Sequence, residues 1–382
     1  MLGAMFLFLA STYFSIAVNS VSLGLMAICW CAIMVWSRRF IVERTPLDYF
    51  FLAYVVAEFL ATAFSVNQAQ SIFFSRRLLL IGIVYFFVTW VTDDRLVKAT
   101  IATVLGTATV VALFGVWKLL FVPPEQTTRL GIFQFYMTTA ELMMIAALLL
   151  LPFAIHQKTP RSIRYASIIA LVPVLVSLYA TVTRGAYLAF AAGALFIILV
   201  RNKKMVIVLI IAVILVVVFA PPYVENRLRS IVDLNHPENA SRLMLWTLGL
   251  RIFADRPFVG VGDIDLGDLF RKYADPDQVI TWGHLHNVPL QFLVTLGAVG
   301  FIVVLVMFVK IFVVEWKVYR ASRDDWFPSS VALGSLAVFV GMQLAGLVEW
   351  SFGDQEVATL FWVTLGMTLA TRRIVRATNT AE

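Results

Sequence analysis

The residues best suited to chemistry stand at the end of one polar segment in a chain that is otherwise mostly apolar. His284 and His286 belong to Trp282-Gly283-His284-Leu285-His286-Asn287, directly before a hydrophobic run. Histidine exchanges a proton near neutral pH, so either imidazole is a candidate general base for activating a hydroxyl. We expect the two rings to point to different sides of an extended segment. No Cys, Asp or Glu cluster adds ligands, so we predict no metal site.

Arginines at the same predicted end of the chain's helices are candidate anion contacts. Arg184 lies in Thr181-Val182-Thr183-Arg184-Gly185-Ala186, at the turn between two apolar helices. A guanidinium is always charged, and its planar fork suits phosphate oxygens. Arg242 falls in the first turns of a helix predicted from Pro237 to about Ala254, where the positive end of the helix dipole also favours a phosphate. The ordinary alternative for each arginine is contact with lipid headgroups.

The composition places these residues in a membrane protein. The 382 residues are 61% hydrophobic and 14% charged, with a mean hydropathy of +0.88, whereas soluble domains are about 45–50% apolar and about 25% charged. A membrane-spanning helix needs roughly 17–25 apolar residues. The sequence therefore predicts an all-α, polytopic transmembrane helix bundle with ten to twelve spans. The candidate spans are 2–17, 19–36, 47–64, 78–91, 97–121, 137–155, 166–182, 185–200, 205–220, 288–312, 329–348 and 356–371.

Basic residues beside the spans predict the orientation. Cytoplasmic segments carry an excess of Lys and Arg, and this places both termini in the cytoplasm and the long polar loop outside. The net charge of +7 then reflects topology and no nucleic-acid partner is expected. The predicted cytoplasmic segments are 37–46, 92–96, 156–165, 201–204, 313–328 and 372–382. Three parts follow: a bundle over 1–220, the outer loop over 221–287, and three spans with a short tail over 288–382.

The outer loop is predicted to contain two helices and a glycine turn. In the first helix, apolar residues recur every three or four positions, which predicts an amphipathic helix on the membrane surface or on the mouth of the bundle; they are Leu243, Trp246, Leu250 and Phe253. Phe258-Val259-Gly260-Val261-Gly262-Asp263 reads as a turn and lacks the spacing of a nucleotide fingerprint. A second short helix is predicted around 266–273.

These features, in this order, resemble the bacterial O-antigen ligase and O-antigen polymerase superfamily. The resemblance covers about residues 120–310. It rests on Arg129-Leu130-Gly131, Thr183-Arg184-Gly185-Ala186, Ser241-Arg242 with Trp246, Arg256-Pro257-Phe258-Val259-Gly260-Val261-Gly262, His286-Asn287 with Leu290-Gln291, and Leu296-Gly297-Ala298-Val299-Gly300. No single motif is specific; their order around one large outer loop is what carries the resemblance.

The resemblance implies a GT-C-like membrane glycosyltransferase of the bacterial inner membrane that faces the periplasm. Its donor would be a glycan on undecaprenyl diphosphate, its acceptor a sugar hydroxyl of lipid A–core or of a glycan, and its reaction inverting and free of metal or other cofactor. His286 matches the family's general base, and Arg184 and Arg242 match arginines that hold the diphosphate. Arg129, Arg251, His284 and Asn287 are further candidates for substrate binding.

Two alternatives to the ligase remain at this stage. An O-antigen or exopolysaccharide polymerase uses the same donor; the short outer segment 122–136 favours the ligase, because polymerases tend to have a second extended outer loop. A multi-pass transporter or flippase belongs to a different class, and it predicts charged pairs near mid-membrane and broken helices in both halves. Here the polar residues gather at the outer face instead.

Overall fold

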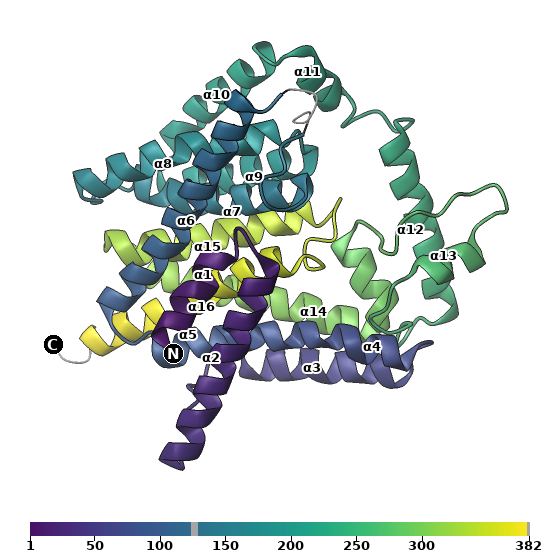
Figure 1. Cartoon of the computed structure of the whole chain (residues 1–382), viewed down its shortest axis with the longest axis horizontal. Helices are drawn as coiled ribbons and strands as arrows, with labels where there is room; N and C mark the ends of the chain where they lie inside the picture. The colour runs from purple at the N-terminus through teal and green to yellow at the C-terminus, as the bar shows by residue number, and fades with distance from the viewer. Residues whose placement is uncertain (124–128, 380–382) are drawn as a thin grey trace.

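The computed structural model describes residues 1–123 and 129–379, and within them the secondary structure is helical without strands (Figure 1). Parts of two predicted segments, 124–128 and 380–382, lie outside the described residues. A helix coincides with every predicted span: α1 Leu2–Ser11, α2 Ile16–Ser37, α3 Asp48–Ala63, α4 Gln68–Ser75 continuing into α5 Gly82–Trp90, α6 Asp94–Phe121, α7 Tyr136–Ile155, α8 Arg161–Ala180, α9 Arg184–Arg201, α10 Val206–Val218, α14 Val288–Ala321, α15 Trp326–Ala345 and α16 Gln355–Asn379. The prediction of an all-α, polytopic bundle is confirmed.

Eight of the described helical segments are long and apolar enough to cross a membrane, or nine if the bent pair α10 and α11 (Pro222–Arg229) forms one span. Among the others, α1 has 10 residues and α3 has 16. At 1.5 Å per residue these rise about 15 and 24 Å, short of a hydrocarbon core of about 30 Å. The predicted count of ten to twelve thus includes helices that do not each cross the membrane alone.

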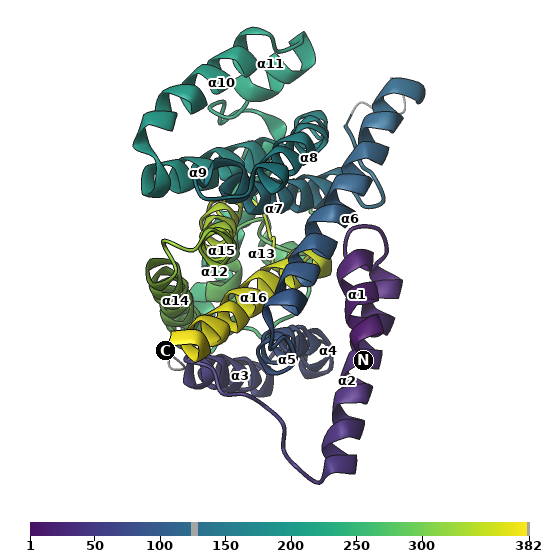
Figure 2. The same cartoon turned by 90° about the vertical axis from the view of Figure 1, so that its left-hand side faces the viewer.

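Two helices form the centre of the bundle. The side chains of α7 and α15 are buried nearly all round, as expected for helices that are apolar on every face. Both helices pack on α9, and α7 also packs on α8. Figure 2 shows α7, α15 and α16 in the middle, with α8, α9 and α10 on one side and α3, α4 and α5 on the other.

Hydrogen bonds and ion pairs between the connecting segments indicate which of them lie at the same end of the bundle. At one end the predicted cytoplasmic segments contact one another, through Lys158 with Asp324, Arg201 with Arg323, and Arg373 with Glu43 and Val88. At the opposite end lie the bonds Ser65 with Val261, Arg129 with Thr181, Thr138 with Asp354, and Asn287 with Leu347. The basic segments therefore share one end of the molecule, and the long polar loop lies at the other.

The glycine turn of the loop forms backbone hydrogen bonds with α14 at a break in that helix. Gly297 has φ 67° and ψ −177°, which interrupts the helix. The backbone N–H groups of Ala298 and Val299 donate to the carbonyls of Pro257 and Phe258. In return, the N–H of Gly262 donates to the carbonyl of Thr295 at 2.9 Å. The polar groups freed by the break are thus paired, and the loop is attached to the bundle at a fixed position.

The predicted loop helices are present as α12 (Pro237–Asp255) and α13 (Gly267–Tyr273). Of the apolar face predicted for α12, Leu243 and Leu250 are 41% and 49% exposed, and a face against the membrane surface stays a prediction. The buried stripe consists instead of Leu245, Leu248 and Ile252, which pack in a cluster that also contains Phe270, Leu285 and Val294. Both stripes recur at spacings of three and four. The neighbouring α13 and α14 decide which one is buried, and spacing along one helix does not reveal them.

Replacing Gly297 with alanine tests the coupling between the loop and α14. An added Cβ would lie 2.4 Å from the backbone carbonyl group of Phe258, and the φ of 67° strains any L side chain. We expect Gly297→Ala to destabilise the protein by about 1–3 kcal/mol and to lower its thermal unfolding midpoint in detergent. Gly82→Ala is the matched control, since its Cβ would meet no atom within 4 Å. Equal midpoints for the two variants would contradict this account of the break.

Candidate active site

His286 is held by the start of α14 and by the segment that follows α15. Asn287 caps α14, with its side-chain oxygen accepting from the N–H of Leu290 at 2.8 Å and its amide donating to the carbonyl of Leu347 at 2.8 Å. His286 has a φ of 48° and is 4% exposed. Its Nδ1 lies 2.7 Å from Oε1 of Glu349. The cap thus attaches the histidine's own backbone to the segment that carries its carboxylate partner.

Glu349 is a buried carboxylate shared by two partners, His286 and Arg242. Its Oε2 lies 3.5 Å from Nη2 of Arg242. Burial by itself raises the pKa of Glu349, but the hydrogen bond and charge of His286, together with Arg242, outweigh it and hold the pKa below its ordinary value. Glu349 is therefore ionised at neutral pH and can only accept hydrogen bonds. Nδ1 of His286 must then be the donor, which leaves its Nε2 as the basic nitrogen.

His284 lies beside His286, and the expectation that their rings diverge is wrong. The ring centroids are 4.1 Å apart, and Trp282 packs against His286 at 4.8 Å. Side chains two residues apart point to the same face of an extended segment, and the positive φ at His286 bends this segment further. Burial, helped by the charge of His286, lowers the pKa of His284 to about 4, so that ring is neutral at physiological pH.

The two predicted phosphate contacts, Arg184 and Arg242, line one cavity together with Arg129. We call it the arginine cavity: it is lined by Arg129, Arg184, Arg227 and Arg242, with Glu141, Glu238 and Glu349 and the neighbouring Met137, Thr183, Gly185, Ala186, Ala345 and Val348. Helices α9 and α12 both begin here, at Arg184 and Pro237. Guanidinium groups and the positive ends of helix dipoles together favour an anion.

Arg184 is fixed by partners from the long loop. Its Nη1 donates to Oγ of Ser230 at 2.8 Å, and its Nη2 lies 3.0 Å from Oδ1 of Asn239 and 3.1 Å from Oε2 of Glu238. Arg227 donates to the same carboxylate at 2.6 Å. Burial alone raises the pKa of Glu238, but the hydrogen bond and charge of Arg227, with the charge of Arg184, bring the pKa below its ordinary value.

Arg129 is held on the other side of the cavity. Its guanidinium donates to the carbonyls of Thr181 and Val182 at 3.3 and 3.2 Å and lies over the ring of Tyr136, 3.5 Å from its centroid. These contacts place the charge next to the turn that precedes Arg184. Arg129 and Arg184 therefore come together from segments 55 positions apart in the sequence.

Two of the predicted substrate contacts lie differently. Arg251 is exposed, donates to the carbonyl of Tyr273 at 3.2 Å and lies 3.9 Å from Asp275, outside the arginine cavity. Asn287 uses both ends of its amide within the protein, as the cap described above. The roles of Arg251 and Asn287 as substrate contacts thus stay predictions. The hydrogen bonds of Asn287 give it a structural role.

Three charged residues of the site could not be assigned from the sequence. Glu349 was visible as an ionisable residue at a span end, and such residues merit a functional hypothesis, but its partner lies 63 positions away. Arg227 and Glu238 lie in the long loop, where charge is ordinary. Only the fold brings Glu238 between Arg227 and Arg184.

One group of side chains could hold a metal ion. The nitrogen and oxygen atoms of His284, His286 and Glu349 lie within 4.8 Å of one another, and imidazole and carboxylate are common metal ligands. The direct hydrogen bond between His286 and Glu349, at 2.7 Å, already occupies one ligand atom of each. The arrangement therefore also works as a paired base and carboxylate without an ion.

Chelation distinguishes these two uses of the group. We expect EDTA to leave the thermal unfolding midpoint of the purified protein unchanged, because a group that binds no ion gains no stability from one. A midpoint that falls in EDTA and is restored by Zn²⁺ or Mn²⁺ would contradict this. His284→Ala is the control, since it removes one ligand and should abolish any such restoration.

Fold and site together define a polytopic helical membrane protein with clustered arginines and a histidine–carboxylate pair at one end of its bundle. Comparison with protein families adds that residues 169–305 match the family described as O-antigen ligase, which supports the superfamily that the motifs indicated. The matched segment contains Arg184, Arg242 and His286 and ends before Glu349. No curated protein matches the chain.

Proposed function

We propose that this protein is a glycosyltransferase that moves a glycan from undecaprenyl diphosphate to a sugar hydroxyl of lipid A–core at the periplasmic face of the inner membrane. The observation that carries the proposal is the pairing of His286 with the ionised Glu349 directly beside a cavity lined by four arginines. A base next to an anion site is what displacement of a diphosphate by a hydroxyl requires.

In the proposed reaction, the diphosphate of the donor binds to the arginines of the arginine cavity, which must open to admit it because its volume in this structure is about 20 Å³. Nε2 of His286 takes the proton of the acceptor hydroxyl, and the oxygen attacks the anomeric carbon from the face opposite the diphosphate. The new C–O bond forms as the bond to the phosphate oxygen breaks, so the configuration inverts. Undecaprenyl diphosphate leaves with the electron pair, and Arg184, Arg227 and Arg242 balance its charge. Glu349 stabilises the imidazolium of His286 until its proton passes to solvent.

The alternatives differ in the acceptor or in the class of activity. A polymerase would perform the same displacement onto another lipid-linked glycan. A transporter or flippase would form no new bond, and the gathering of four arginines and the histidine–carboxylate pair at one end of the bundle argues for chemistry there instead.

Transfer by the reconstituted protein tests the proposal. With a lipid-diphosphate glycan and lipid A–core, and without metal or ATP, we expect product from the wild type and a loss of about 10²-fold or more in His286→Ala and in Arg184→Ala. Arg229→Ala is the matched control, because Arg229 is exposed and, within the described part of the chain, pairs only with Glu225 of its own helix. A product formed only on lipid-linked glycan would identify a polymerase. Lipid movement without a new glycosidic bond would refute both enzymes.

Cysteine labelling tests the proposed orientation. The chain has two cysteines, Cys29 and Cys31, which are first changed to serine. In cells with a permeabilised outer membrane, an impermeant maleimide should label Asp277→Cys in the long loop, whereas Lys203→Cys should react only after lysis; both positions are exposed. Reversed labelling would place the site on the cytoplasmic side and contradict a periplasmic reaction.

A further inference from the structure

A second cavity lies on the other side of Glu349. We call it the acidic cavity. It has a volume of about 220 Å³ and is lined by Asp263, Asp265, Asp354 and Glu349 with Arg77, His284, Gln291, Trp350 and the neighbouring Phe74, Ile264, Gly283 and Gly353. Glu349 lines both this cavity and the arginine cavity. Glu349 therefore stands between two compartments.

The charges of the two cavities are opposite in balance. Four carboxylates and a single guanidinium, that of Arg77, line the acidic cavity, whereas four guanidiniums and three carboxylates line the arginine cavity. At separations of a few ångströms, like charges in a partly buried site repel strongly. A diphosphate is thus directed to one side of Glu349 and kept from the other, which leaves the acidic cavity for a different ligand.

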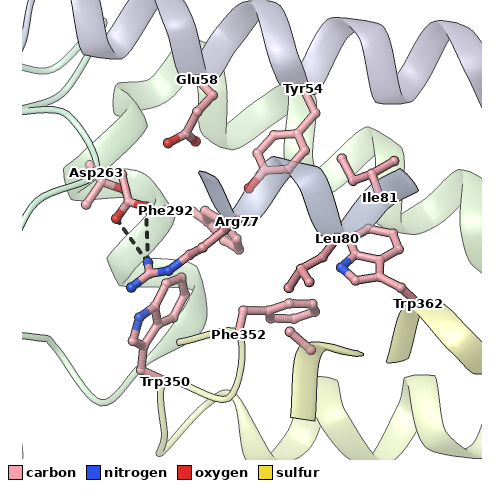
Figure 3. Close-up of a pocket in the computed structure, with 12 residues that line it drawn as sticks. Tyr54, Glu58, Arg77, Leu80, Ile81, Asp263, Phe292, Trp350, Phe352 and Trp362 are labelled. Atoms are coloured by element: carbon pink, nitrogen blue, oxygen red, sulfur yellow. Dashed lines mark hydrogen bonds and ion pairs between the residues drawn. The ribbon is translucent and has the colours of Figure 1, made fainter. Parts of the chain in front are cut away.

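Contacts with the protein hold the carboxylates of the acidic cavity in place. Nη1 of Arg77 donates to both oxygens of Asp263, at 3.2 and 3.1 Å (Figure 3). Oγ1 of Thr138 donates to Oδ2 of Asp354 at 2.6 Å. Each oxygen of an ionised carboxylate accepts more than one hydrogen bond, so these groups remain able to accept from hydroxyls of a ligand.

Two uncharged polar side chains of the cavity have unused hydrogen-bonding capacity. Gln291 is 2% exposed, and its Oε1 accepts from the N–H of Leu285 at 3.0 Å; its amide nitrogen makes no hydrogen bond to the described residues. Nδ1 of His284 is buried and likewise has no partner among them. Buried polar groups are normally paired, so Nδ1 of His284 points to a hydrogen-bonding ligand in this cavity, and the amide of Gln291 could bind the same ligand.

An aromatic wall completes the cavity. Trp350 lines the acidic cavity and also a second, neighbouring pocket. Arg77 and Asp263 line both spaces as well. Figure 3 shows Arg77 between Asp263 and the indole of Trp350, and beyond them Phe292, Phe352 and Trp362. Carboxylates, an amide and an imidazole beside an indole match a sugar, which presents hydroxyls at its rim and apolar C–H groups on its faces.

We propose that the acidic cavity binds the terminal sugar of the acceptor, and that this sugar carries no negative charge. This inference rests on the proposed function, because it identifies the cavity beyond Glu349 as the acceptor side of the same site. A ligand there would lie next to His284, whose ring touches that of His286. The volume of 220 Å³ is below the range of about 300–1,000 Å³ typical of drug-sized ligands, which favours a single sugar ring.

Binding to the protein in nanodiscs tests this without turnover. The probes are a glucose-terminated disaccharide and its glucuronic acid-terminated counterpart, and binding is measured by saturation-transfer NMR. We expect the neutral sugar to bind the wild type about tenfold or more tightly than the acidic one. In Asp354→Asn and in Asp265→Asn the ratio should shrink to about threefold or less, because each removes one repelling charge. Asp268→Asn makes the same change on the exposed α13, outside the cavity, and should keep the wild-type ratio.

The transfer assay, run alongside the binding measurement, separates this inference from the proposed function. Equal binding of the two sugars, no binding of either, or a ratio that both cavity variants leave unchanged would overturn the acceptor cavity, even if the wild type forms the glycosidic bond. Selective sugar binding that disappears in the cavity variants would support the cavity. The absence of any transfer would in that case overturn only the proposed function.

Discussion

The site depends on one buried carboxylate and on what neutralises it. Removing an ionised glutamate from water costs several kcal/mol unless partners compensate, and Glu349 has His286 at 2.7 Å and Arg242 at 3.5 Å. The same two contacts set the tautomer of His286 and hold Arg242 at the arginine cavity. The charge balance that allows Glu349 to be buried is therefore also what arranges the base and the anion site around it.

The fold keeps these three groups together although they come from distant parts of the chain. Arg242 belongs to α12, whose buried stripe packs in one cluster with Leu285 and Val294. The glycine turn that follows α12 pairs with the break at Gly297, and the Asn287 cap binds the carbonyl of Leu347, two residues before Glu349. Loop, α14 and the end of α15 thus form one unit. A displacement of any of them would separate the carboxylate from its partners.

The sequence was sufficient for features that depend on local composition. Long apolar runs predicted the helices, Pro237 predicted the start of α12, and the motifs around Arg184, Arg242 and His286 indicated the family before any geometry was known. It failed where the outcome depends on a distant partner. The sequence could not distinguish the stripe of α12 that is buried in the fold from its other apolar stripe, because α13 and α14 select it. The His284 and His286 rings were expected to diverge, yet they adjoin. Glu349 looked like one more charge at a span end, since nothing near it in sequence names His286 as its partner.

A double-mutant cycle on His286 and Glu349 tests the central claim most directly. If Glu349 acts in transfer by orienting His286 and stabilising its protonated form, Glu349→Gln should lower kcat in the wild type by about 10–100-fold. The same substitution should have almost no further effect in the His286→Ala background, because contacting residues with one shared role are non-additive. Additive losses, with Glu349→Gln equally harmful whether or not His286 is present, would contradict the account.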